Sequence, residues 1–343
     1  MAHQSFYRTH RPHSFKEVSG QPQVTEALSE QVKNKKVGHA YLFAGSRGLG
    51  KTSVARIFAA ELGTTERDLY EIDAASNNSV DDIRSLSENV YTLPFESPYK
   101  VYILDEAHML SKSAWNAFLK TLEEPPAHAI FILATTELSK VPETVQSRCQ
   151  VFTFKKPVRS ELAKVVANVG KKEGYSVDPA AADLIALLAE GSYRDALSVL
   201  ERVCAASADN KITREEAEKA TGAPKHELVS KLAAALSEGN AEAALVAIRN
   251  AADSSVDMPL FLSLTLDHMR AVLLVRHAPE LRAEFKEELG ELYADVEKVA
   301  ADKASKLNHR VLQSFLDAAA RMRYASVPSL PIELAVLSLF GQD

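Results

Sequence analysis

The chain has 343 residues, of which 46% are hydrophobic and 25% are charged, and this composition excludes a disordered chain and a collagen-like repeat. Two cysteines exclude a disulfide scaffold, and no apolar run approaches the roughly 18 residues of a membrane helix, so we expect a cytoplasmic protein without membrane contacts. The formal charge of −6, from 40 Lys and Arg against 46 Asp and Glu, argues against strong DNA binding by one chain alone.

Short apolar runs alternate with helical stretches between residues 41 and 136. This alternation is typical of a parallel sheet covered by helices on both faces, so we expect an α/β domain here. A further β-like run follows at Gln150–Phe154. The predicted strands are Tyr41–Ala44, Val101–Leu104 and Ile130–Ala134, and the predicted helices are Lys51–Leu62, Val80–Val90 and Ser111–Leu122.

The strand signals fade after Pro157, and the rest of the chain has helical patterns. From Lys225 onward apolar residues recur with helical spacing, and Gly222–Pro224 marks a boundary before them. The sequence therefore predicts three parts: an α/β domain at residues 1–157, a small helical domain at 158–222 and an all-α domain at 223–343. The four helices predicted for the middle part are Ser160–Lys172, Pro179–Ala189, Tyr193–Ala206 and Arg214–Thr221.

The segment Gly45–Thr52 matches the phosphate-binding pattern G-x-x-x-x-G-K-[ST] in full. A predicted strand precedes it and a predicted helix follows it, so its backbone N–H groups and the helix N-terminus can surround a phosphate. An ordinary Gly-rich turn between strand and helix would not require the Lys-Thr pair. We therefore predict a nucleotide site in which Lys51 reaches the phosphates and Thr52 ligates Mg²⁺. The predicted nucleotide contacts are Gly45, Ser46, Arg47, Gly48, Leu49, Gly50, Lys51, Thr52 and Ser53.

Two adjacent acids end the predicted strand at Val101–Leu104. Asp105 would hold Mg²⁺ and Glu106 would polarise the attacking water, which is the division of labour that phosphoryl hydrolysis needs. Taken alone, the pair could be two solvated acids at a strand end. The tetrad that runs from Asp105 to His108 also allows a DEAH-type helicase, but the helical patterns after Pro157 offer no second nucleotide-binding sheet for one.

Three other positions carry weaker signals. Thr135 and Thr136 end a predicted strand, where a hydroxyl could reach the γ-phosphate or could simply be a common strand-end residue. Arg148 follows Ser147 before the last β-like run, and a single arginine there is more often an ion-pair partner. Arg194, in the first turn of a predicted helix, has no assigned chemistry on its own.

Eight strings together carry a resemblance to the gamma/tau subunits of bacterial DNA polymerase III, a family of clamp-loader ATPases within the AAA+ group. They occur in the family's order over residues 4–222, whereas residues 223–343 resemble the family's collar domain only through their helical pattern and Pro331. The strings are Arg11–Gln21, His39–Phe43, Glu71–Ser76, Asp105–Ser111, Leu119–Pro126, Ala134–Thr136, Ser147–Cys149 and Gly191–Leu197.

The resemblance implies roles for the weaker positions. Arg148 matches an arginine finger that completes the ATP site of a neighbouring subunit, and Arg194 matches the sensor-2 arginine that contacts nucleotide from the second domain. Thr136, with Thr135 as the less favoured choice, matches the sensor-1 residue. The resemblance also places adenine contacts at Tyr7, Arg8, Arg11, Pro12 and Val18.

The resemblance further implies that the chain is a motor subunit. ATP would organise it with further gamma-like copies and with the delta and delta-prime subunits, so that the ring opens the beta sliding clamp on primer–template DNA at the replication fork. The helix starts near Ser76–Val80 and Ser111–Lys112 would then face the DNA phosphates. The alternative within the same family is a nucleotide-binding structural subunit that does not hydrolyse ATP.

The sequence departs from the family at two places. The family usually carries a four-cysteine zinc module after the phosphate-loop helix, but Glu61–Tyr70 has no cysteine, and Cys149 and Cys204 cannot supply four ligands. We therefore predict no zinc. The chain also ends at the collar-like region, so it is expected to be gamma-like in extent, without the long tau extension.

Overall fold

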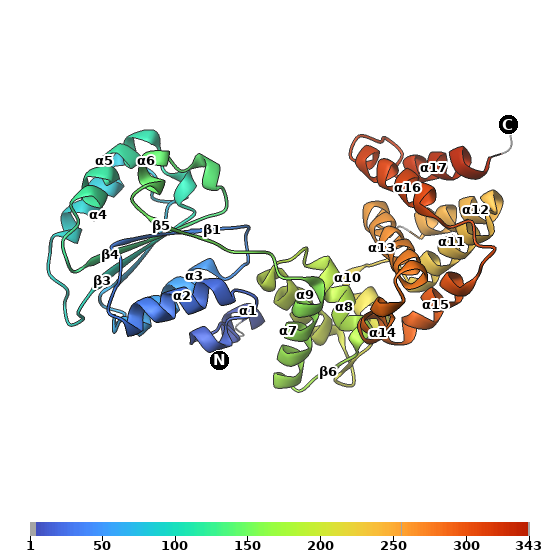
Figure 1. Ribbon diagram of the computed structural model, residues 1–343, viewed down its shortest axis with the longest axis horizontal. Helices are drawn as coiled ribbons and strands as arrows, with labels where there is room; N and C mark the ends of the chain where they lie inside the picture. The colour runs from blue at the N-terminus through green and yellow to red at the C-terminus, as the bar shows by residue number, and fades with distance from the viewer. Residues whose placement is uncertain (1–4, 255, 342–343) are drawn as a thin grey trace. The chain divides into compact units, whose positions relative to one another are not determined.

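The computed structural model describes residues 5–254 and 256–341 (Figure 1). It divides into two compact units. The first comprises Met1–Val165 with Ala189–Ser198, and the second comprises Val166–Leu188 with Val199–Asp343. The boundaries of the three domains expected above remain predictions.

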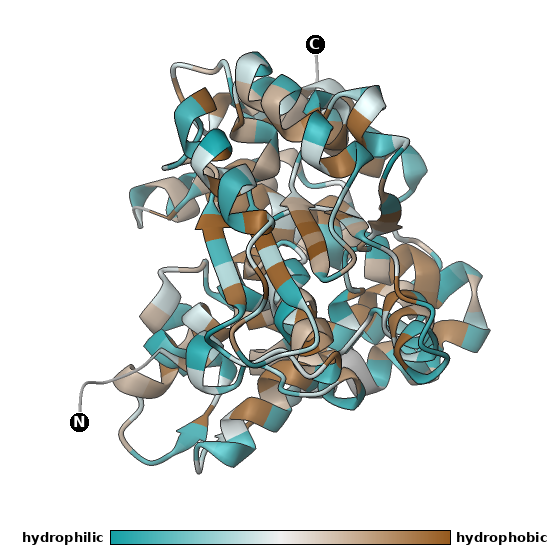
Figure 2. Ribbon diagram, turned by 90° about the vertical axis from the view of Figure 1, so that its left-hand side faces the viewer, coloured by the Kyte–Doolittle hydropathy of each residue, from teal (hydrophilic) through white to brown (hydrophobic). Residues whose placement is uncertain are grey.

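A five-stranded parallel sheet forms the centre of the first unit. Its order is β2 (Leu69–Asp73), β3 (Lys100–Asp105), β4 (Ala129–Thr135), β1 (Ala40–Ala44) and β5 (Gln150–Thr153). Every residue of β1 and β4 is buried, as expected for strands that helices cover on both faces. Figure 2 shows hydrophobic residues along the strands of this sheet. The predicted α/β architecture is confirmed.

Alternate residues of the strands face two separate hydrophobic cores. Tyr102 and Phe131 pack in one core with α4 (Val80–Val90) and α5 (Lys112–Glu123), and Phe43 packs in the other with α2 (Pro22–Lys33) and α3 (Lys51–Glu61). Figure 1 shows these two helix pairs on opposite sides of the sheet. The remaining short elements of the unit are α1 (Phe6–Thr9), η1 (Phe15–Glu17), η2 (Ala107–Met109), η3 (Leu138–Lys140) and α6 (Glu143–Gln146).

Strand β2 was not predicted as a strand. It lies at the edge of the sheet, and none of its residues is fully buried, so its sequence lacks the continuous apolar run that marks the central strands. The strand contains two polar residues, Glu71 and Asp73, which interrupt the apolar run that would predict a strand. Edge strands of this kind are recognised from their pairing, here with β3, rather than from composition.

The helices predicted between residues 158 and 222 are present. They are α7 (Arg159–Lys172), α8 (Pro179–Leu188), α9 (Tyr193–Ala206) and α10 (Arg214–Thr221). The expectation of helices alone was wrong, because β6 (Ser176–Val177) pairs with β7 (Lys211–Ile212) in a small parallel sheet. Strands of two residues are too short to show any periodicity in sequence.

The rest of the second unit is helical, as predicted. Helix α13 is long and apolar enough by length and composition to cross a membrane, but more than half of its most apolar window is buried in the unit, where it contacts α11, α15 and α16. That burial is typical of a core helix. The elements are α11 (His226–Glu238), α12 (Ala241–Asp253), α13 (Met258–His277), η4 (Pro279–Leu281), α14 (Arg282–Leu289), η5 (Gly290–Leu292), α15 (Tyr293–Ala301), α16 (His309–Met322) and α17 (Leu330–Phe340).

Candidate functional site

The loop between β1 and α3 has the geometry of a phosphate cradle. Gly45, Gly48 and Gly50 have φ angles of +151°, +76° and +88°, which residues other than glycine rarely adopt. Gly50 lies directly before α3, so the loop leads into a helix N-terminus whose first N–H groups have no acceptor inside the helix. Loop and helix start therefore offer N–H donors to an anion.

Lys51 lies inside this loop rather than in solvent. Only 6% of the residue is exposed, and its Nζ donates hydrogen bonds to the carbonyl oxygens of Gly45 at 2.7 Å and Ser46 at 2.9 Å. Burial lowers the pKa of Lys51, while the nearby charges of Glu106 and Asp105 act in the opposite direction. A cation is thus held at the centre of the cradle, where a phosphate would replace the carbonyl contacts.

The end of β3 meets the start of α3 through one hydrogen bond. Thr52 Oγ1 donates to Asp105 Oδ2 at 2.7 Å, and Glu106 follows with a φ of +49°. A hydroxyl beside a carboxylate is a donor set that suits Mg²⁺, which takes few protein oxygens and completes its shell with water and phosphate oxygens. Thr52 and Asp105 therefore fit the predicted magnesium ligands.

The two threonines at the end of β4 have different surroundings. Thr136 Oγ1 donates to Glu106 Oε2 at 3.2 Å, so its hydroxyl contacts the acid predicted to act on water. Thr135 is completely buried, where its Oγ1 lies 3.1 Å from His108 Nδ1 and accepts a hydrogen bond from the Glu137 N–H at 3.0 Å. The geometry favours Thr136 over Thr135 as the residue nearer the chemistry.

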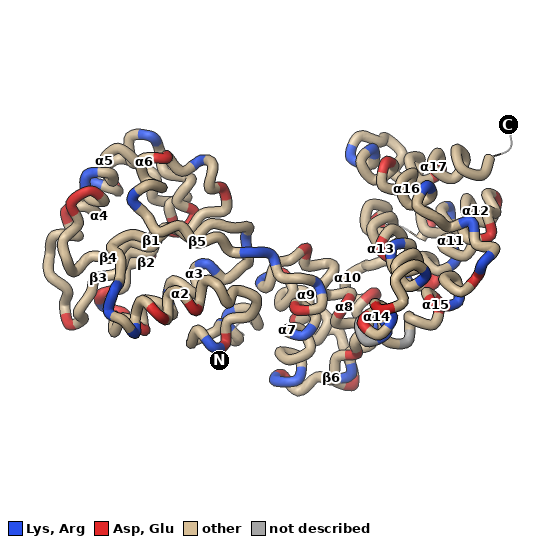
Figure 3. The backbone as a smooth tube through the Cα atoms, in the orientation of Figure 1, with Lys and Arg blue, Asp and Glu red and all other residues tan. Residues whose placement is uncertain are grey.

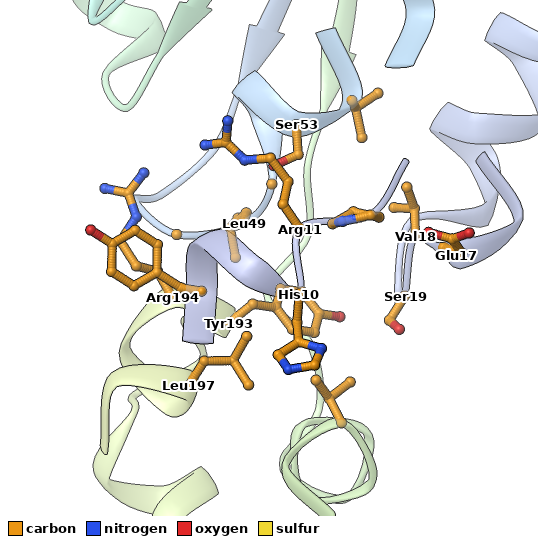
Figure 4. Close-up of a pocket in the computed structure, with 16 residues that line it drawn as sticks. His10, Arg11, Glu17, Val18, Ser19, Leu49, Ser53, Tyr193, Arg194 and Leu197 are labelled. Atoms are coloured by element: carbon orange, nitrogen blue, oxygen red, sulfur yellow. The ribbon is translucent and has the colours of Figure 1, made fainter. Parts of the chain in front are cut away.

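Two adjoining clefts open beside the loop. Both are open to solvent; the larger has about 750 Å³ of empty space and the smaller about 410 Å³, open solvent included. Figure 4 shows Arg11 and Arg194 on either side of Leu49 in the larger cleft. Its lining residues are Tyr7, His10, Arg11, Pro12, Glu17, Val18, Ser19, Gly48, Leu49, Gly50, Ser53, Val54, Val165, Tyr193, Arg194 and Leu197. The smaller cleft is lined by Arg11, Arg47, Gly48, Leu49, Gly50, Lys51, Thr52, Ser53, Asp105, Glu106 and Arg194.

Four of the five residues predicted to contact adenine line the larger cleft, namely Tyr7, Arg11, Pro12 and Val18. Arg8 is not among its lining residues, and its guanidinium carbon lies 5.8 Å from the centre of the Tyr7 ring. Sequence reasoning assigned no role to seven other lining residues. Four of them lie within the strings Arg11–Gln21 and Gly191–Leu197 without having been singled out, and the others lie outside those strings. They are His10, Glu17, Ser19, Val54, Val165, Tyr193 and Leu197.

Positive charge is concentrated at the clefts. The smaller cleft has four basic side chains, Arg11, Arg47, Lys51 and Arg194, and only two acidic ones. Burial lowers the pKa of Arg11, and the positive charges of Arg56 and Arg194 lower it further. Elsewhere the two signs are interspersed along the chain (Figure 3). Like charges held together around an open volume favour an anionic ligand.

Arg148 contributes to neither cleft among the described residues. It follows α6, where its Nη1 donates to the Thr144 carbonyl at 2.7 Å and its Nη2 donates to Glu123 Oε1 of α5 at 2.6 Å. About a third of the side chain is exposed. The structure therefore does not bring Arg148 together with Lys51 and Asp105.

The cysteines have the chemistry of buried thiols. Burial raises the pKa of Cys149 and of Cys204 to about 12, so both are protonated at neutral pH and poor metal ligands. Among residues 5–254 and 256–341, no group of three or more His, Cys, Asp or Glu side chains is arranged to hold a metal ion.

Three families match consecutive stretches of the chain. "DNA polymerase III, delta subunit" matches residues 20–71 and 64–158, "DNA polymerase III clamp loader subunit, ATPase lid domain" matches 161–209, and "DNA polymerase III subunits gamma and tau domain III" matches 212–342. Together they span almost the whole sequence.

Curated relatives agree with these matches. DNA polymerase III subunit tau of Bacillus subtilis is 35% identical over 99% of this chain and 63% of its own length. The tau subunit of Escherichia coli is 36% identical over 81% of this chain and 46% of its own length, and the gamma/tau subunit of Mycobacterium tuberculosis is 36% identical over 80% and 52%. The chain thus spans about half to two thirds of the length of these relatives.

Solved structures support the fold. The RuvB Holliday junction branch migration motor of Thermotoga maritima has a TM-score of 0.54 and 23% identity, covering 66% of this chain and 78% of that one. This likeness in fold agrees with the expected AAA+ architecture. The chain belongs to the gamma/tau family of DNA polymerase III clamp-loader subunits.

Proposed function

We propose that the chain is an ATP-driven motor subunit of a clamp loader, which hydrolyses ATP to open the beta sliding clamp and load it onto primer–template DNA in the cytoplasm. The observation that carries the proposal is the contact of Thr52 with Asp105, with Glu106 beside them and Lys51 inside the glycine loop. A phosphate chain in the smaller cleft would meet all four residues.

The two clefts divide the binding of ATP between them. The smaller, cationic cleft suits the triphosphate, which Lys51 and Arg194 would neutralise through charge-assisted hydrogen bonds. The larger cleft would take the purine nucleoside among lining residues that include Tyr7, Val18 and Leu197. Because the clefts share Arg11, Gly48 and Arg194, one ligand with an anionic end and an apolar end matches both.

Hydrolysis needs an activated water and neutralisation of developing charge. Mg²⁺ held by Thr52 and Asp105 would supply Lewis-acid stabilisation of the phosphate oxygens. The Glu106 carboxylate would orient and deprotonate water, and the hydroxyl of Thr136, 3.2 Å from Oε2 of Glu106, would hold that carboxylate or the water in place.

Neutralisation of the charge that develops during hydrolysis would explain why the subunit works in an assembly. Arg148 lies outside both clefts of its own chain, and we propose that it enters the ATP site of a neighbouring subunit as an arginine finger. The neighbours would be further copies of this chain and the delta and delta-prime subunits. An assembly arranged in this way hydrolyses ATP only when its subunits are correctly apposed.

DNA contact would come from few groups per chain. Helices α4 and α5 begin side by side, since the Ser111 N–H donates to the Asn78 carbonyl at 3.3 Å, and Ser79 and Ser111 cap the two helices. Paired helix N-termini can contact phosphates without a basic face. The charge of −6 is therefore compatible with DNA binding that is multiplied around a ring.

The ATPase rate of the complex tests this proposal. We expect Glu106→Gln to lower turnover with primed DNA and clamp by about 10²–10⁴-fold, the usual contribution of a positioned acid or base, while nucleotide still binds. Equal rates for Glu106→Gln and the unmodified complex would instead identify a nucleotide-binding structural subunit. A DEAH-type helicase is disfavoured, because the described residues after Pro157 contain only the two short strands β6 and β7.

A further inference from the structure

The N-terminus of α9 is hydrogen-bonded to the phosphate loop. Tyr193 is the first residue of α9, so its N–H has no acceptor within the helix, and it donates instead to the Gly48 carbonyl at 3.1 Å. Ser192 precedes the helix and caps it, since its Oγ accepts from the Asp195 N–H at 3.2 Å. One backbone hydrogen bond therefore joins the helix that carries Arg194 to the loop that carries Lys51.

Two glycines leave room for the residues at this joint. A methyl group on Gly48 would overlap with the Ser192 hydroxyl, and one on Gly20 would overlap with the Tyr193 hydroxyl. Gly20 adjoins Gln21, whose completely buried side chain donates to the Lys155 carbonyl at 2.7 Å and accepts from the Lys155 N–H at 3.1 Å. Tyr193 thus fits against a segment that is itself anchored to the backbone of Lys155, just after β5.

The Tyr193 ring is held by packing rather than by hydrogen bonding. Its hydroxyl oxygen is buried and has no hydrogen-bond partner among the residues that the structure describes, and burial raises the pKa of Tyr193. Figure 4 shows the Tyr193 ring beside His10, while the side chain of Arg194 leaves α9 in a different direction. The Cβ of Arg194 lies within 3.5 Å of the position that a Gly48 Cβ would take, so the arginine begins directly against the loop.

We infer that Ser192 and Tyr193 form a positioning joint, which fixes the α9 N-terminus on Gly48 and Gly20 and thereby sets the place of Arg194 over the phosphate loop. This inference rests on the proposed ATP site. Neither residue needs to touch nucleotide for the joint to act. Without the joint, Arg194 would have to be ordered when the ligand binds, and that ordering would weaken binding.

Comparing Tyr193→Pro with Tyr193→Ala distinguishes the contribution of the backbone hydrogen bond from that of the side chain. Both substitutions remove the ring, but only Tyr193→Pro removes the N–H donor, and proline is tolerated at the first position of a helix. In the full chain, we expect calorimetry to show ADP bound roughly 3- to 10-fold more weakly by Tyr193→Pro than by Tyr193→Ala, as for the loss of one hydrogen bond. Equal affinities of the two variants would overturn the joint.

The dependence on Arg194 is tested by repeating the pair in an Arg194→Ala background. If the joint acts through the arginine, the difference between proline and alanine should shrink to less than about twofold there. A difference of the same size in both backgrounds would reduce the hydrogen bond to a structural role and contradict the inference.

A rescue experiment covers the case in which the proline variant unfolds. Gly20→Ala should weaken ADP binding, and adding Tyr193→Phe should restore part of the loss, because it removes the hydroxyl that the new methyl group meets. No rescue would count against the joint. Absence of ADP binding by the unmodified chain would overturn the ATP site itself, whereas a normal turnover of Glu106→Gln would overturn hydrolysis and leave the joint standing.

Discussion

The nucleotide clefts of the first unit and a polar cluster in the second unit both contain ionisable side chains, but these side chains are satisfied differently. At the clefts, Arg11, Lys51 and Arg194 gather like charges around an open volume. In the second unit, His226 and Asp295 are hydrogen-bonded to each other. Unmatched charges that surround a cavity indicate a ligand, whereas mutually satisfied groups indicate a structural role.

The cluster of the second unit joins three helices. His226 of α11 lies 3.1 Å from Asp295 of α15 through Nε2 and Oδ2, and the hydroxyl of Ser230 lies 2.9 Å from the same Nε2 and donates to Oδ2 at 3.1 Å. The ring of His268 of α13 lies 5.8 Å from that of His226. Because Ser230 and Asp295 contact the same ring nitrogen of His226, this arrangement is not that of a nucleophile activated through histidine.

We expect the largest effect from Arg148, which belongs to neither the clefts nor the polar cluster. Arg148→Ala should lower turnover of the assembled complex by about 10³-fold or more, since a trans arginine neutralises charge that develops on the γ-phosphate. Nucleotide affinity of the isolated chain should stay within about twofold, because Arg148 lines neither cleft. Steady-state ATPase assays and calorimetry measure the two quantities.

Arg148→Lys is the matched control for charge. Lysine keeps the positive charge but loses the forked donors of the guanidinium, so we expect most of the defect to remain. An equal loss of turnover in a strictly monomeric preparation would place the arginine in its own site and would contradict the trans assignment.

Lys51→Ala removes the cation at the centre of the cleft. We expect ATP affinity to fall by about 100-fold, because the charge-assisted contacts to phosphate are lost, with little change in the urea midpoint of unfolding. In the described structure Lys51 Nζ donates to two loop carbonyls, and burial disfavours the charged form of the side chain. Its removal should therefore not destabilise the fold. Unchanged affinity would contradict the cradle.

The same contrast explains what the sequence could predict. Gly45–Thr52 and the acids at Asp105 and Glu106 were recognisable, because a phosphate cradle needs fixed residue types at fixed local spacing. The sides of the larger cleft were not, since residues as far apart in the chain as His10 and Tyr193 line the same cleft only after folding. Arg148 was singled out through the resemblance alone.

The cluster of the second unit left no sequence signal. His226, His268 and Asp295 come from three helices and are separated by tens of positions, so no local pattern relates these three residues. Strand β2 shows the same limit for the fold, because its identity depends on pairing with β3 rather than on an apolar run. Motifs of adjacent residues can be recognised in the sequence, whereas hydrogen bonds between polar groups far apart in the chain cannot.

Acid should destabilise the second unit through His268. Burial, and then the charge of His226, lowers the pKa of His268 to about 4. Asp295 and Asp267 act to raise this pKa, and Arg214 acts to lower it. The unfolded chain takes up the proton near pH 6.5, so stability is complete above that pH and is lost as the pH falls toward 4. Between pH 7 and pH 5 we expect a loss of about 2 kcal/mol.

Urea unfolding followed by circular dichroism at the two pH values measures this loss, and His268→Gln is the control. The glutamine cannot titrate, so the difference in unfolding free energy between the unmodified chain and the variant should itself change by about 2 kcal/mol from pH 7 to pH 5. A difference that is independent of pH would show that His268 is not the titrating group.

The smallest effect is expected at Ser230, whose hydroxyl bridges His226 and Asp295. Ser230→Ala should cost about 1 kcal/mol of unfolding free energy, because the direct contact of 3.1 Å between His226 and Asp295 remains after the bridge is removed. Ser254→Ala, which removes only a local hydrogen bond to the Asn250 carbonyl, is the control and should change stability less. If Ser230→Ala instead changed ADP affinity and left stability intact, the cluster would have to be treated as a second ligand site, and the contrast between the two regions would fail.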